Sequence, residues 1–233
     1  IEQITSKAFP QVYVKEFASL TAAQSREADE AVRAALRKLQ TYQIAEGAFA
    51  YWPGGTSSNA WGTVYATHFM LEAESKGYLP ESQVKSAALA NLKLVARSWK
   101  SQGGNYSWSE NLTQAYRLYV LALAGQQETG AMNRLREDKT LPSEARWMLA
   151  AAYARIGRPD IGKQIITETR EMTTSRDSQY HLTYRSDVRT RAVSLLALVA
   201  LSQAQQAAGP PQKISSRVSS RCRVSPTTTG LPA

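Results

Sequence analysis

Cysteine and histidine are scarce in this sequence. Its 233 residues include one cysteine, Cys222, and two histidines, His68 and His181. A single cysteine cannot form a disulfide within the chain. Two histidines without a cluster of cysteines or carboxylates do not provide the donor set of a metal site. We therefore expect no disulfide framework, no metal and no other cofactor.

Long apolar runs are also missing. No stretch approaches the roughly 18 to 20 consecutive apolar residues of a membrane-spanning helix, and no signal-peptide pattern is present. A chain that opens on Ile1, Glu2 and Gln3 without a methionine is expected to be a fragment of a longer protein. The missing signal therefore says nothing about where that protein resides.

Acidic residues are outnumbered, giving a formal net charge of +9. Part of the excess comes from residues 209–233, which contain basic residues and no acid. Elsewhere charges of both signs alternate, as in residues 26–30 and 134–139. This pattern is typical of a solvated helix surface, and no nucleic-acid motif accompanies it. We expect no nucleic-acid partner.

Residues 209–233 differ in character from the rest of the chain. Ser, Thr, Pro and Arg dominate, and the apolar residues are isolated. Such a segment cannot bury a core. We predict one helical domain over residues 1–208, followed by a disordered tail that carries Cys222.

Before the tail, apolar residues recur with helical period and no strand alternation is convincing. Thr21 and Gln24 form a possible capping box, Gly77 provides a stop signal, and Pro80 suits a first helical turn. The predicted helices span residues 21–43, 61–76, 79–100, 110–126, 141–156, 159–172 and 186–208.

Three of these helices align on a threonine, at Thr63, Thr113 and Thr190, and each follows an aromatic turn. The unit is therefore a helical hairpin with an aromatic loop leading into it. The spacings of 50 and 77 residues are too irregular for a short solenoid repeat. We predict an all-α fold, an α/α toroid in which inner helices line a ring and outer helices wrap it. Periodicity alone equally permits an open helical array.

Particular segments resemble the thioester domain of bacterial alpha-2-macroglobulins. They are Ile1-Glu-Gln-Ile-Thr-Ser-Lys-Ala-Phe-Pro-Gln11, Tyr51-Trp-Pro-Gly-Gly55 and Trp61-Gly-Thr-Val-Tyr-Ala-Thr-His-Phe69, followed by residues 116–125, 130–137 and 146–153. The resemblance covers roughly residues 1–208 and implies an incomplete toroid. It also implies a broad-range endopeptidase inhibitor that traps proteases and is not an enzyme. The implied location is the periplasm, with a membrane reached only through a lipid anchor of the parent. The implied partners are target endopeptidases and the parent's remaining macroglobulin domains.

The same resemblance implies thioester chemistry at Gln3. In the family's Cys-x-Glu-Gln motif, the cysteine thiol and the glutamine side chain condense with loss of ammonia. A lysine of a cleaved protease then attacks the thioester and becomes covalently bound. Ile1 and Glu2 flank the candidate acyl donor Gln3, and the cysteine would immediately precede Ile1. Some family members lack this cysteine and trap non-covalently, so both mechanisms stay open.

Six aromatic residues are candidates for shielding a thioester from water: Tyr51, Trp52, Trp61, Tyr65, Tyr106 and Trp108. Packing between hairpins would explain the same residues, because aromatics dominate helix-bundle cores. We expect His68 to be a helix histidine with satisfied partners rather than a catalytic base. Glu72 and Glu74 are two residues apart on a helix, so their carboxylates point to different faces.

Two other functions fit parts of the sequence. An α/α-toroid enzyme acting on a carbohydrate or isoprenoid would need acids clustered near the aromatic loops, where only Glu110 and Asp187 occur. Such an enzyme would be indifferent to methylamine, which opens thioesters. A helical-repeat scaffold for peptides is disfavoured by the irregular spacing.

Overall fold

The computed structural model describes residues 1–101, 107–139, 141–172 and 187–208. Regular structure within these residues is helical and includes no strand, so the predicted all-α class is confirmed. The predicted tail, Cys222 and His181 lie outside the described residues. The helices are α1 (Glu2–Phe17), α2 (Ala22–Leu39), η1 (Gln40–Tyr42), α3 (Ala60–Ser75), α4 (Ser82–Ser98), α5 (Ser107–Leu123), α6 (Thr129–Glu137), α7 (Ser143–Arg155), α8 (Pro159–Met172) and α9 (Asp187–Ala208).

Local signals place several helix ends correctly. The Thr21 hydroxyl accepts from the backbone N–H of Gln24 at 3.3 Å, and the Gln24 side chain accepts from the Thr21 N–H at 2.9 Å, which completes the capping box. Gly77 follows α3 with a φ of 85°, where a side chain would be strained. One detail was wrong: α4 begins at Ser82, so Pro80 precedes the cap at Glu81 and is not in the first turn.

Two helices, α1 and α6, were not predicted. Pro10 lies in the middle of α1, and only Thr5, Ala8 and Val12 of this helix are buried. Proline normally interrupts a helix, because it removes a backbone donor. Packing against α2 and α3 holds α1 in place despite this cost.

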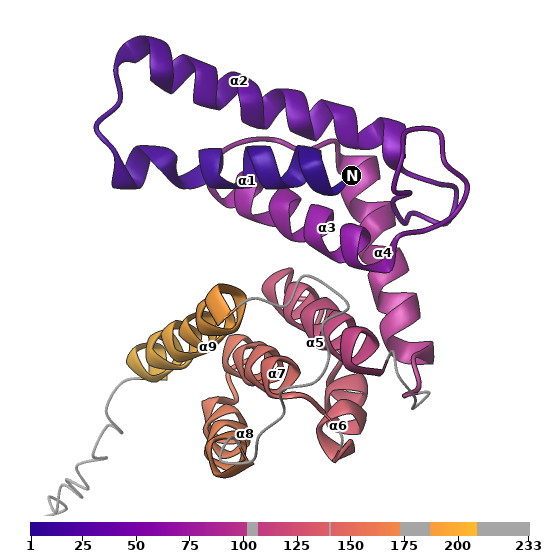
Figure 1. Cartoon of the computed structure of the whole chain (residues 1–233), viewed down its shortest axis with the longest axis vertical. Coiled ribbons are helices and arrows are strands. Elements are labelled where there is room, and N and C mark those ends of the chain that lie inside the picture. The colour runs from indigo at the N-terminus through magenta and orange to yellow at the C-terminus, as the bar shows by residue number, and fades with distance from the viewer. Residues whose placement is uncertain (102–106, 140, 173–186, 209–233) are drawn as a thin grey trace, which may run out of the picture.

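The helices alternate between two layers. Each odd-numbered helix from α1 to α9 packs against the next odd-numbered helix, while the even-numbered helices pack onto this row. Figure 1 shows α5, α7 and α9 in one row, with α6 and α8 on the same side of it. A ring of hairpins requires this alternation, and its closure into a toroid stays a prediction.

Helices α1 and α3, neighbours in the row of odd-numbered helices, run in the same direction. Contacts between α1 and α3 advance along both helices together, so both begin at the same end of the molecule. The contacting pairs are Ile1 with Gly62, Phe9 with Phe69, Tyr13 with Glu72, and Glu16 with Lys76. The start of α1 and the loop before α3 therefore meet.

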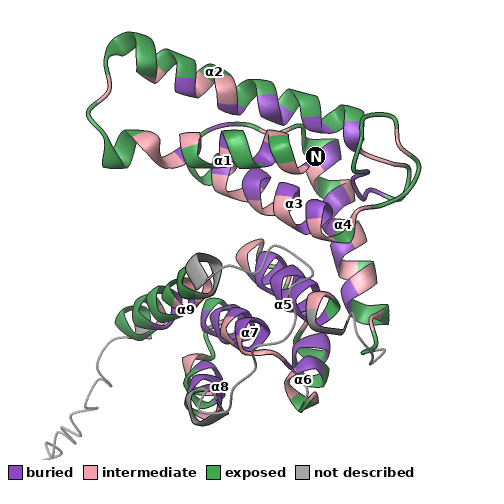
Figure 2. Cartoon of the chain, viewed as in Figure 1, coloured by how far each residue is buried: buried purple, intermediate pink, exposed green. Residues whose placement is uncertain are grey.

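Buried side chains form two clusters, one centred on α1 to α3 and one on α5, α7 and their neighbours. Figure 2 shows α5 and α7 mostly buried and the outward turns of α2 exposed. Gly162 of α8 permits close packing on α7, because a Cβ at this position would lie 2.9 Å from the Ala150 carbonyl oxygen. None of the described helices is long and apolar enough to cross a membrane.

Candidate functional site

The start of α1 is held against α3 and against the loop that precedes α3. The backbone nitrogen of Ile1 donates to the carbonyl oxygen of Tyr51 at 2.7 Å. The Ile1 side chain is buried, and a Cβ on Gly62 would lie 2.5 Å from its Cγ2 atom. Only glycine allows this approach, so residue 62 sets how closely α1 docks on α3.

Hydrogen bonds hold the aromatic turn, residues 51–55, in position. The Phe49 N–H donates to the hydroxyl of Thr63 at 2.9 Å, and that hydroxyl donates to the Asn59 carbonyl at 2.7 Å. The Gly54 N–H donates to the Thr41 carbonyl at 3.0 Å. Thr63, one of the aligned threonines of the sequence, thus ties the turn to the first turn of α3.

A hollow of about 210 Å³ lies between the start of α1 and the aromatic turn. Its lining consists of Ile1, Glu2, Gln3, Ile4, Lys7, Lys38, Tyr42, Tyr51 and Trp52. The candidate acyl donor Gln3 therefore shares this hollow, which we call the Gln3 hollow, with two of the six predicted aromatics. The rings of Tyr51 and Trp52 meet edge to face, with centroids 5.0 Å apart.

Of the four remaining predicted aromatics, two pack between helices and two fall on residues or side chains that the structure does not describe. Trp61 packs on Tyr116, with centroids 5.3 Å apart, and Tyr65 packs on Phe9 at 5.6 Å. Neither lines the Gln3 hollow, so packing between helices accounts for both. Tyr106 and the side chain of Trp108 lie outside the described residues.

The Gln3 hollow is open to solvent. The Gln3 side chain is exposed, Tyr51 is 41% exposed and Trp52 is 66% exposed. A thioester survives only where water is excluded, so a thioester at Gln3 needs more cover than the described residues supply.

Sequence reasoning missed a series of hydrogen-bonded side chains that connects α1, α3 and α5. The Tyr13 hydroxyl of α1 donates to Glu72 of α3. Glu72 lies 3.3 Å from Nε2 of His68, whose Nδ1 lies 2.7 Å from the Tyr116 hydroxyl of α5. His68 is thus partnered on both nitrogens, as expected of a structural histidine. The i, i+4 spacing of His68 and Glu72 was the available signal.

The burial and the contacts of these four side chains shift the pKa values of three of them. The hydrogen bond from His68 holds the pKa of Glu72 below its ordinary value, although burial acts in the opposite direction. Burial raises the pKa of Tyr116 well above its usual range. Burial and the bond to Glu72 likewise raise the pKa of Tyr13. Glu72 is therefore ionised and both tyrosines are neutral near pH 7.

Glu72, Glu74 and Glu110 lie in different surroundings in the described part of the structure. Glu72 faces α1, whereas Glu74 contacts Lys85 of α4 at 2.5 Å, so the two carboxylates diverge as expected. Glu110 is exposed, and the side chain of Asp187 lies outside the described residues. Within the part of the chain that the structure describes, no group of three or more His, Cys, Asp or Glu residues could hold a metal.

Comparisons with known proteins identify relatives of this chain. No protein-family model matches it. Over 177 residues it is 25% identical to an alpha-2-macroglobulin homolog of Yersinia pestis, a match that covers 72% of this chain and 8% of that protein. The native conformation of E. coli alpha-2-macroglobulin matches 90% of this chain and 14% of its own, with a TM-score of 0.70 and 21% identity. Salmonella alpha-2-macroglobulin reacted with methylamine matches 90% of this chain and 15% of its own, with a TM-score of 0.67 and 23% identity. The matched regions of these structures share the all-helical fold of this chain.

Proposed function

We propose, from the confirmed resemblance of this chain to the bacterial alpha-2-macroglobulins, that it is part of an inhibitor that traps endopeptidases. The observation that supports this most directly is the sequence match to an alpha-2-macroglobulin homolog over 177 residues. Because that match spans 8% of the relative, trapping belongs to a larger protein whose other domains are partners of this one. The proposed location is the cell envelope.

Gln3 is the proposed acyl donor, provided that cysteine precedes Ile1. The Ile1 nitrogen donates to the Tyr51 carbonyl, which holds the start of α1 beside the aromatic turn. Gln3 sits in the first turn of α1. A tight turn immediately before this helix would bring the cysteine sulfur to the Gln3 side chain.

Formation of the thioester needs only the two side chains, and its opening needs only an amine. The thiol of the cysteine adds to the Gln3 carboxamide carbon, and ammonia leaves, forming the thioester. A lysine amine of a protease then attacks the same carbon. The carbon–sulfur bond breaks, an amide forms, and the amine proton passes to the thiolate. The step consumes the thioester, so each molecule reacts once.

The test uses the intact protein that contains this chain. After incubation with trypsin, a denaturing gel is expected to show a covalent adduct. Prior treatment with methylamine and the substitution Gln3→Ala are each expected to abolish that adduct. If cysteine does not precede Ile1, the expected result is protection of a large protein substrate from trypsin without an adduct. The proposal would be overturned if the intact protein formed no adduct with trypsin and also failed to protect the large substrate.

A further inference from the structure

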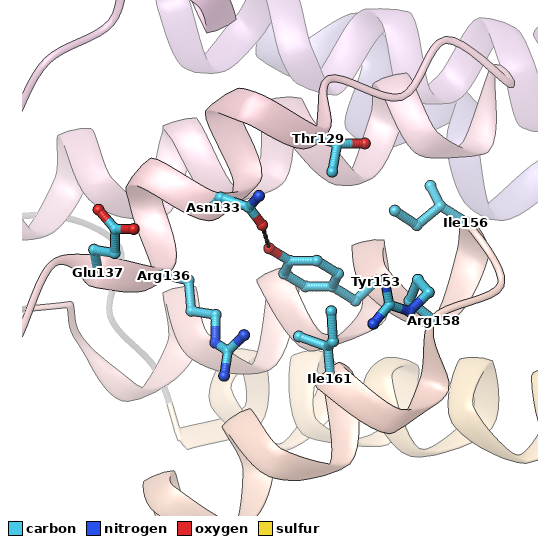
Figure 3. Close-up of a pocket in the computed structure, with 8 residues that line it drawn as sticks. All are labelled: Thr129, Asn133, Arg136, Glu137, Tyr153, Ile156, Arg158 and Ile161. Carbon is cyan, nitrogen blue, oxygen red and sulfur yellow. Dashed lines mark hydrogen bonds between the residues drawn. The ribbon is translucent and has the colours of Figure 1, made fainter.

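A second cavity, of about 560 Å³, lies where α6 meets the end of α7 and the start of α8 (Figure 3). We call it the α6–α8 cavity, and it shares no lining residue with the Gln3 hollow. Its lining consists of Thr129, Asn133, Arg136, Glu137, Tyr153, Ile156, Arg158 and Ile161. The volume falls in the range of natural ligand sites, about 300 to 1,000 Å³.

Hydrogen-bond donors line this cavity. The buried Tyr153 hydroxyl donates to Asn133 Oδ1 at 2.6 Å, which leaves the Asn133 amide N–H groups available (Figure 3). Arg136 is partly buried and has no hydrogen bond or ion pair among the described residues. Arg158, in contrast, pairs with Asp160 through two contacts of 3.1 and 2.9 Å.

Charges of both signs surround Tyr153. Burial raises the pKa of Tyr153 by more than the charges of Arg136 and Arg158 lower it. The carboxylate of Glu137 also raises this pKa. Asp160 pairs with Arg158, so Arg136 is the positive charge left for a ligand. Figure 3 shows the Tyr153 ring between the two arginine side chains and the Glu137 carboxylate pointing away from it. A partly desolvated guanidinium without a counter-ion favours a carboxylate, which it can bind with two parallel hydrogen bonds.

The remaining wall of the cavity is apolar. Ile156 and Ile161 line it together with the face of the Tyr153 ring. A small inorganic anion would satisfy Arg136 but leave this wall in contact with water. A ligand that carries both a carboxylate and an apolar group matches both parts of the lining.

We propose that the α6–α8 cavity binds an acidic peptide segment of a partner protein. A Glu or Asp carboxylate of the segment pairs with Arg136, and a neighbouring aliphatic side chain packs against Ile156 and Ile161. The inference needs neither Gln3 nor a thioester, so it stands or fails separately from protease trapping.

The test is an NMR titration of the ¹⁵N-labelled chain with two blocked dipeptides. The acidic probe is N-acetyl-leucyl-glutamate amide, and the neutral probe is N-acetyl-leucyl-glutamine amide, which differs only in the charged group. The acidic probe is expected to shift the backbone resonances of α6 and of residues 156–162. Its Kd is expected to be at least about tenfold lower than that of the neutral probe, because a hydrogen bond to a charged group typically strengthens binding by this factor or more.

Substitutions separate the two halves of the site. Arg136→Gln is expected to remove the preference for the acidic probe, and Ile161→Ala to weaken both probes. Arg26→Gln on α2 is the matched control, because this exposed arginine bonds only within its own helix. Equal binding of both probes, or no shift up to about 10 mM, would overturn the proposal. So would inorganic phosphate that shifts the same resonances as strongly as the acidic probe.

Discussion

At the scale of single residues, Glu72 joins three helices. Its carboxylate accepts from the Tyr13 hydroxyl of α1 and contacts His68, which in turn meets Tyr116 of α5. The Glu72 side chain is 17% exposed, so these bonds form largely away from water. Hydrogen bonds to a charged, partly buried group each contribute about 1.5 to 3 kcal/mol. Glu72 therefore stabilises the docking of α1 on the inner row.

We predict that Glu72→Gln destabilises the chain by about 1 to 3 kcal/mol at pH 7. The pKa of Glu72 is lowered in the folded protein. Its contribution is therefore fully present above the unfolded pKa, near 4.3, and is lost as pH falls through the folded pKa. The stability difference between the two proteins is expected to vanish at low pH. Urea unfolding at pH 7, 5 and 3 measures it.

Glu74→Gln is the control for this prediction. Glu74 pairs with Lys85 at the surface, where its side chain is 39% exposed. Exposed ion pairs contribute at most about 1 kcal/mol, so this variant should remain close to the native protein at every pH. A difference for Glu72→Gln that does not change with pH would show that the carboxylate charge is not what stabilises the site.

At the scale of helices, the docking of α1 on α3 determines where Gln3 lies. The two helices run parallel, and Gly62 lets the side chain of Ile1 approach the first turn of α3. Phe9 extends the contact, with ring centroids 5.6 Å from Tyr65 and 5.7 Å from Phe69. The start of α1 is thus aligned with the aromatic turn by packing, and the Gln3 hollow follows from it.

We predict that Gly62→Ala destabilises the chain by about 1 to 3 kcal/mol. The added Cβ would lie 2.5 Å from Ile1 Cγ2, and overpacking of this kind costs more than the helix gains from alanine. Amide hydrogen exchange is expected to be faster in the first turns of α1. Gly130→Ala provides the comparison, because its Cβ would have no neighbour nearer than 3.8 Å. That variant should be as stable as the native chain or more so. Equal stability changes in both variants would contradict the packing argument.

At the scale of the whole molecule, α9 is the last described helix of the odd-numbered row and is partly uncovered. α7 has neighbours on both sides, in α5 and α9. On α9, Leu195, Leu198 and Val199 are 62%, 43% and 43% exposed. Their spacing places them on one face, and contiguous exposed apolar patches promote association.

We predict that Leu195→Gln combined with Leu198→Gln reduces self-association of the chain. Helix content and unfolding free energy should change little, within about 0.5 kcal/mol for each exposed site. Light scattering across a range of concentrations measures the effect. Leu94→Gln on α4 is the control, since Leu94 is 67% exposed but lies outside this patch. Undiminished association of the double variant would show that the α9 face is not responsible.

The sequence determined much of this protein through local rules. Helical periodicity identified seven helices, the Thr21–Gln24 capping box began α2, and Gly77 closed α3. Gln3 and the aromatic turn were each recognisable as well, because each belongs to a contiguous segment, but their proximity to one another was not. These features depend on residues within a few positions of one another, and that is the distance over which caps, turns and amphipathic faces are defined.

Tertiary structure decided what joins distant segments. α1 forms although it contains Pro10, because α2 and α3 hold it. Trp61 and Tyr65 pack between helices, while Tyr51 and Trp52 line the Gln3 hollow, a division that no local pattern distinguishes. The Tyr13–Glu72 bond and the α6–α8 cavity depend on how whole helices align in three dimensions. Sequence periodicity sets which face of a helix is buried, but only packing sets which neighbour that face meets.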